Sequence, residues 1–164
     1  MTSRTSKDCA IHEAGHAVIA HVLGYKIQKV ISPKSAAPHA MCELAPRAER
    51  DRETEGRDRM CFCFAGIAAN MRDVAGEWVG GEPEGWRSDR RMAAGIAHDL
   101  FPWEDESGES AAEKALEEEK ERAAEEIDRC WPAVEALAWA LEARQALPGD
   151  EVHGIIKNVL THLH

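Results

Sequence analysis

The stretch His12-Glu13-Ala14-Gly15-His16 holds the residues of this chain whose types and spacing are best suited to chemistry. In a helix, residues four apart lie on one face, about 6 Å apart along the axis, so both imidazoles can reach one metal ion. Zinc accepts imidazole ligands and, in hydrolytic sites, lowers the pKa of a water molecule toward ~7. A glutamate beside the ligands is suited to accept the proton. The pattern therefore predicts a zinc centre with His12 and His16 as ligands and Glu13 as general base.

The predicted zinc centre needs a third protein ligand, because a catalytic site has three protein ligands and one open position. A carboxylate in the first turn of a helix is kept ionised by the helix dipole, as a metal ligand must be. Asp89 is expected at such a place, directly after a glycine-rich loop. Residue type alone leaves several candidates open, namely His39, His98, His153, Glu77, Glu82, Glu84 and Asp89. The alternative for the motif itself is a pair of ordinary histidines at the border of a polar helix face.

The composition limits the class of protein. The chain has 164 residues, of which 44% are hydrophobic, which predicts a single folded domain over 1–164. Its net charge of −10 argues against nucleic acid as a partner. The longest apolar run, 61–69, is too short to cross a bilayer, and the first seven residues lack the apolar core of a signal peptide. We therefore expect a cytoplasmic protein without membrane insertion.

The five cysteines are odd in number and scattered, which is typical of free thiols in a reducing compartment. Cys61 and Cys63 are close enough in sequence to share a metal ion, but no second cysteine pair is present to complete a structural zinc site. We therefore expect buried core thiols at both positions.

Apolar periodicity and capping residues predict a mainly helical α+β fold, with a small β-hairpin or sheet beside the zinc-binding helix. Ser6 is expected to cap the first helix and Gly24 to end it. The predicted strands are the only β structure expected, and the second should lie at a sheet edge. The predicted elements are helices at 6–22, 52–71, 88–100, 104–128, 131–147 and 151–162, strands at 26–31 and 39–44, and a long loop at 73–87.

Most residues outside the motif are expected to serve the fold by packing, exposure to solvent or hydrogen bonding. Gly66 is expected to let another helix approach closely. Trp78 and Trp86 are expected in the core or in a cleft wall, with a substrate pocket as the alternative. The Glu-rich helix is expected to be a solvated outer face, with an acidic docking surface as the alternative. The remaining histidines are expected to be at the surface or hydrogen-bonded, namely His21, His98, His153, His162 and His164.

Several short segments occur together and in a fixed order along the chain. They are HEAGHAV at 12–18, KVISP at 29–33, FAGIAA at 64–69, the Ser88-Asp89 step into a helix, ALAWAL at 136–141 and LPGDE at 147–151. In these segments the chain resembles the protease domain of the FtsH family, the membrane-anchored AAA-plus zinc proteases. The resemblance covers most of the chain, and its first motif is the specific one. It implies that Asp89 is the third zinc ligand beside His12 and His16, with Glu13 as the base.

The chain also departs from that family. No Gly-x-x-x-x-Gly-Lys-Ser/Thr phosphate loop occurs in these residues, and neither an ATPase module nor a membrane helix is expected. Ser88-Asp89-Arg90 lacks the extra polar residue and the leucine that usually flank the family's aspartate. Without a motor, the activity that the resemblance implies is that of a zinc metalloendopeptidase acting on unfolded or flexible polypeptide segments.

Other functions and partners stay open. One alternative is a regulatory metalloprotease that cuts one dedicated partner protein. Another is a non-catalytic module, in which zinc stabilises the fold and the acidic helix recruits a partner. A separate ATPase chain as partner and the oligomeric state are not decided by the sequence. The strand at 39–44 is expected either to hold a peptide substrate by main-chain hydrogen bonds or to pack in the core.

Overall fold

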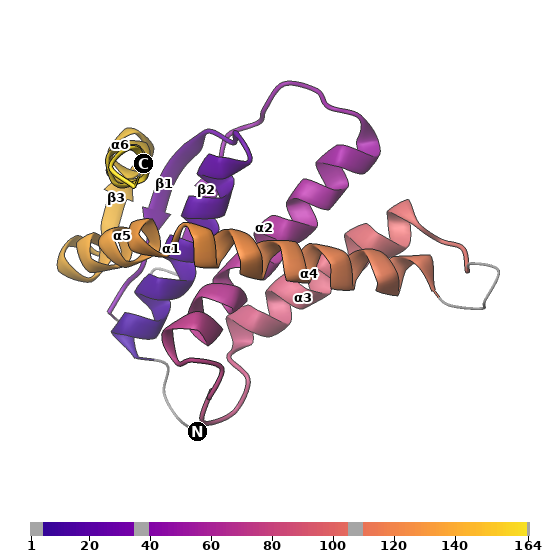
Figure 1. The fold of residues 1–164 in the computed structure, drawn as a ribbon, viewed down its shortest axis with the longest axis horizontal. Coiled ribbons are helices and arrows are strands. Elements are labelled where there is room, and N and C mark those ends of the chain that lie inside the picture. The colour runs from indigo at the N-terminus through magenta and orange to yellow at the C-terminus, as the bar shows by residue number, and fades with distance from the viewer. Residues whose placement is uncertain (1–4, 35–39, 105–109, 164) are drawn as a thin grey trace.

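The computed structural model describes residues 5–34, 40–104 and 110–163 (Figure 1). These residues form the predicted mainly helical α+β fold with a small antiparallel sheet, which has three strands. The predicted strand residue and candidate ligand His39 lies outside the described residues, as does His164. The elements are α1 (Ser6–Val22), β1 (Ile27–Ile31), β2 (Met41–Leu44), α2 (Arg52–Asp73), α3 (Glu84–Leu100), α4 (Ala111–Arg129), α5 (Trp131–Arg144), β3 (Ala146–Pro148) and α6 (Gly149–Thr161).

Helix α1 begins and ends where the sequence predicts, although its cap differs by one residue. The hydroxyl of Thr5 accepts a hydrogen bond from the Asp8 backbone N–H, and the Asp8 carboxylate accepts one from the Thr5 backbone N–H. Thr5 is therefore the N-cap, and the prediction of Ser6 was wrong. The helix is buried continuously from Ala10 to Ala20. The two histidines of the motif consequently lie in the core, and not at the border of a polar face.

Helix α2 is the central helix, packed against α1, α3 and α4 (Figure 1). Its close contact with α1 depends on a glycine in each helix. A Cβ on Gly15 would lie 2.6 Å from the Ala65 carbonyl oxygen, and a Cβ on Gly66 would lie 2.6 Å from the His12 ring. Real Cβ atoms do not approach so closely, so the predicted close approach at Gly66 is confirmed.

The sheet has the order β2-β1-β3, with both neighbours antiparallel to β1. The third strand was not predicted, because residues 146 and 147 were assigned to the end of the helix predicted at 131–147. Gln145 instead adopts a left-handed conformation (φ 63°), which ends α5 and turns the chain back along β1. Leu147 is then buried opposite Val30. Strand β2 lies at an edge of the sheet, as predicted.

Helix α3 begins one turn earlier than predicted. Pro83 is its N-cap and Glu84 its first residue, so Ser88 does not cap it. Proline fits a helix start because the first N–H groups have no partner within the helix. Trp86 therefore lies on the helix and Asp89 lies in its second turn, so the placement of Asp89 in the first turn was wrong. The connection from α2 shortens to 74–83.

Helix α4 begins at Ala111, capped by Ser110, and not at 104; residues 105–109 lie outside the described residues. One face packs in the core through small and apolar side chains, and the remaining Glu-rich surface is largely exposed. Arg122 donates hydrogen bonds to Glu119 of the same helix and to Asp58 of α2. Arg129 donates to Glu126 of the same helix.

Two further expectations concern thiols and membranes. All five cysteines are free, and Cys61 and Cys63 are buried as predicted. Within the described ranges, no helix combines the length and apolar character needed to span a bilayer.

Candidate metal centre

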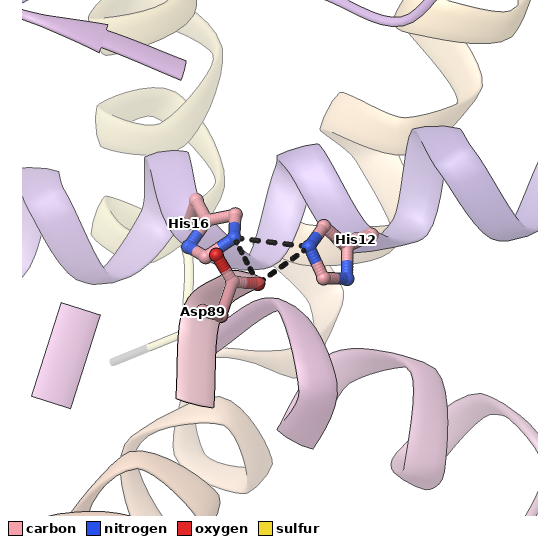
Figure 2. Close-up of side chains that lie close together, drawn as sticks. All are labelled: His12, His16 and Asp89. Atoms are coloured by element: carbon pink, nitrogen blue, oxygen red, sulfur yellow. Dashed lines mark hydrogen bonds and ion pairs between the residues drawn. The ribbon is translucent and has the colours of Figure 1, made fainter. Parts of the chain in front are cut away.

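Three side chains predicted as zinc ligands meet between α1 and α3 (Figure 2). The Nε2 atoms of His12 and His16 are 3.1 Å apart. Asp89 Oδ2 lies 3.0 Å from the first and 3.3 Å from the second. Both histidines are buried, at 2% and 5% exposed, and Asp89 is partly buried. Of the open candidates for the third ligand that lie in the described ranges, Asp89 alone joins this cluster.

The tautomer of His12 is set by Asn70, a buried residue of α2. Trp86 Nε1 can only donate, and it donates to Asn70 Oδ1 (3.0 Å). Asn70 Nδ2 in turn donates to the Asp8 backbone carbonyl (2.9 Å), so both neighbours fix the orientation of the amide. The same Oδ1 lies 3.0 Å from His12 Nδ1. His12 must therefore carry its proton on Nδ1, and its Nε2 lone pair faces Asp89.

The tautomer of His16 follows from a backbone acceptor. Its Nδ1 lies 2.8 Å from the carbonyl oxygen of Phe62, which can only accept, so Nδ1 donates. The Phe62 ring also packs against the imidazole, with 4.8 Å between the ring centroids. The neutral ring of His16 is thus held with its Nε2 lone pair toward His12 and Asp89. A histidine that donates its second nitrogen in this way is typical of metal ligands.

The consequence is a cluster of three electron-pair donors without a hydrogen between them. With both rings neutral, Asp89 Oδ2 faces two lone pairs, and this buried oxygen has no hydrogen-bond donor. Burying such an oxygen without a partner costs free energy. A proton on one imidazole would satisfy one contact, whereas a bound cation would satisfy all three atoms.

The spacing of the three atoms fits a tetrahedral ion. Ligands bound to zinc at about 2.0–2.1 Å in tetrahedral geometry lie about 3.3 Å from one another. The observed separations of 3.0, 3.1 and 3.3 Å are close to that value. Two imidazoles and one carboxylate are also ligand types that zinc accepts in catalytic sites. The residues therefore fit zinc by type, tautomer and spacing.

The pKa values of Asp89 and His16 are shifted in opposite directions. Burial would raise the pKa of the Asp89 carboxyl, but the two neighbouring imidazoles of His12 and His16 hold it below its ordinary value. Burial would lower the pKa of His16, but Asp89, Glu13 and the Phe62 carbonyl together raise it. The surroundings thus favour an ionised carboxylate facing a cation.

Glu13 is buried beside this cluster, at 5% exposed. Its carboxylate contributes to the raised pKa of His16, and it adds to the effect of burial in raising the pKa of the Cys42 thiol. Cys42 belongs to β2, so the carboxylate is near enough to both His16 and the edge strand for its charge to act on them.

Substitution of Gly66 by alanine is expected to weaken both folding and zinc binding. The new methyl group would meet the His12 ring at 2.6 Å, so the ring or the helix must move. We expect the free energy of unfolding to fall by about 1–3 kcal/mol and zinc affinity to fall as well. Urea unfolding and zinc titration measure the two effects.

Gly95 of α3 provides the matched control for Gly66, because a Cβ there meets nothing within 4 Å. Gly95→Ala is expected to raise the free energy of unfolding by about 0.5–1 kcal/mol through helix propensity and to leave zinc affinity unchanged. Equal effects of the two substitutions would contradict the proposed contact between Gly66 and His12.

Sequence reasoning missed the residues that orient the side chains of the candidate metal centre. Asn70 was given no role, although a polar residue on the apolar side of a helix is a signal of a buried hydrogen bond. Trp86 was assigned to a loop and stacks on Trp78. Phe62 acts through its backbone carbonyl, which no residue type reveals. Away from the centre, His21 and His153 bond each other, as expected of ordinary histidines.

Comparison with known protein families and with curated proteins found no match to this chain.

Proposed function

We propose that this chain is a zinc-dependent metalloendopeptidase that hydrolyses peptide bonds in unfolded or flexible polypeptide segments. The observation that carries the proposal is a set of three atoms that face one another: His12 Nε2, His16 Nε2 and Asp89 Oδ2. Because both imidazoles carry their proton on Nδ1, no hydrogen lies among these three atoms. The resemblance to the FtsH protease domain supports the same function.

The roles of the residues follow from their positions. His12, His16 and Asp89 would hold the ion, and Asn70 and Phe62 would keep the two rings oriented. Zinc, when bound, would acidify a water molecule and polarise the scissile carbonyl group. Glu13 would accept the proton of the attacking water and return it to the leaving amine.

The substrate would be held by the sheet edge next to Glu13. Among the described residues β2 pairs with β1 alone, so its other edge would be able to form main-chain hydrogen bonds with an extended peptide. An extended peptide is available only in unfolded or flexible segments, which agrees with the proposed substrate class.

The arrangement favours an enzyme over a non-catalytic zinc module. A structural site is closed by four protein ligands, whereas the cluster found in the described ranges has three. A structural site also has no use for a buried carboxylate such as Glu13 beside two of its ligands.

The test is hydrolysis of an unfolded protein such as casein by the purified chain, with zinc, after chelation, and after zinc is restored. We expect cleavage with zinc, loss of cleavage after chelation, and recovery on addition of about one zinc per chain. Stoichiometric zinc without cleavage of any unfolded protein would contradict the peptidase proposal and favour the zinc module.

A further inference from the structure

A groove of about 520 Å³ runs beside the candidate metal centre, between α2 and the segment that follows β2. Its volume lies within the range of ligand pockets, about 300–1,000 Å³. Three of its lining residues adjoin the metal centre. Phe62 packs on His16. The charge of Asp89 contributes to the raised pKa of the Cys63 thiol. Met92 lies one turn after Asp89 on α3.

One wall of the groove is held rigid by a network of ion pairs. Arg47 donates to the carboxylates of Glu55 and Asp58 and to the backbone carbonyl of Leu23, and its guanidinium stacks on the Tyr25 ring at 3.8 Å. The Tyr25 hydroxyl donates to Glu55. A wall fixed by so many contacts is preformed, which lowers the cost of ordering it when a ligand binds.

The lining of the groove combines apolar side chains with charged ones, and among its described residues one cation is unpaired. Tyr25, Leu44, Phe62 and Met92 supply the apolar surface. Arg59 makes no hydrogen bond or ion pair within the described part of the chain, and its charge acts on Cys63 one turn away.

Arg59 differs from the other arginines of the groove because it has no acidic partner among the described residues. Arg47 and Arg50 are neutralised by Glu55 and Asp58. Glu49 is also unpaired in the described residues, but it lies on the segment after β2, across the groove from α2. An exposed arginine left unpaired in a protein of net charge −10 is available for a carboxylate of a ligand.

We infer that this groove selects polypeptide segments in which a bulky apolar side chain is followed by an acidic residue. The apolar side chain lies against Tyr25 and Phe62, and the carboxylate binds Arg59. The inference rests on the proposed peptidase function, because it names the sequence preference of that same site.

The experiment measures binding of short unstructured synthetic peptides by fluorescence anisotropy. The peptides are identical except for a central Phe-Glu, Phe-Gln, Ala-Glu or Ala-Gln pair. The protein carries Glu13→Gln so that the peptides stay intact, and it is used with and without zinc. We expect Phe-Glu to bind most tightly, with a loss of about tenfold or more for Ala and about three- to tenfold for Gln.

Three further variants test whether the peptides bind in this groove and at Arg59. Arg59→Met is expected to remove the difference between Phe-Glu and Phe-Gln, whereas Arg91→Met, which removes an exposed charge on α3 outside the groove, is expected to keep it. Ala48→Trp places a large ring in the groove from an exposed position and is expected to weaken binding of the phenylalanine peptides.

The outcomes separate this inference from the proposed function. Equal binding of the Glu and Gln peptides to the parent protein, or an equal loss with Arg59→Met and Arg91→Met, would overturn the inference even if zinc-dependent cleavage were observed. The expected pattern of binding in a protein that takes up no zinc would support the groove and overturn the peptidase proposal.

Discussion

The Glu13→Gln variant is expected to lose hydrolysis by about 10²–10⁴-fold while it still binds one zinc per chain. Glutamine has the size of glutamate but cannot accept a proton, so the substitution removes the base and leaves the shape of the site. Glu13 is outside the three-atom cluster of His12, His16 and Asp89, so the ion should keep its ligands. The measurement is the initial rate of casein cleavage together with zinc content.

The matched control for Glu13→Gln is Glu77→Gln, the same chemical change at an exposed position in the connection between α2 and α3. Its rate is expected to equal that of the parent protein. Full activity in pure Glu13→Gln protein would remove Glu13 from the mechanism, and loss of zinc from that variant would show that Glu13 serves the ion and not the proton.

The Asp89→Asn variant is expected to lose zinc affinity by more than about 100-fold, which exceeds the effect typical of residues that only support a ligand. The amide keeps the shape of the carboxylate but is a neutral and poor ligand. It can donate a hydrogen to Nε2 of His12 or His16, which the carboxylate cannot do. The zinc-free variant is therefore expected to be as stable as the zinc-free parent, or more stable.

The readout for Asp89→Asn is the shift in Tm on adding zinc. A ligand present at about 1,000 times its Kd stabilises a protein by about 4 kcal/mol, so the parent should show a clear rise and the variant little or none. Asp99→Asn, an exposed change on the same helix, should behave like the parent. An unchanged zinc shift in Asp89→Asn would exclude Asp89 as a ligand.

The cluster of His12 and His16 could be predicted from the sequence because the information for it is local. His12 and His16 are four apart in one helix, so their common face follows from helix geometry alone. Asp89 was favoured by its place after the glycine-rich loop, but only the resemblance singled it out, since seven residues competed for the third position. Its predicted place at a helix start was wrong, yet the side chain still reaches the histidines because the helix begins one turn earlier.

The remaining features depend on contacts between distant parts of the chain. The short strand β3 has a sequence that also suits a helix, and its pairing with β1 becomes visible only when the sheet is assembled. Asn70 receives its role from Trp86 and His12, which are far from it in sequence. The groove arises where α2 meets the segment after β2, so no single stretch of sequence encodes it.

The most direct test of the metal centre is an anomalous difference map, recorded at the zinc absorption edge from crystals of the zinc-loaded protein. We predict one peak about 2.0–2.1 Å from His12 Nε2, His16 Nε2 and an Asp89 oxygen, with one coordination position open to water. A map without a peak between these atoms, from protein that was supplied with zinc and never exposed to a chelator, would contradict the account.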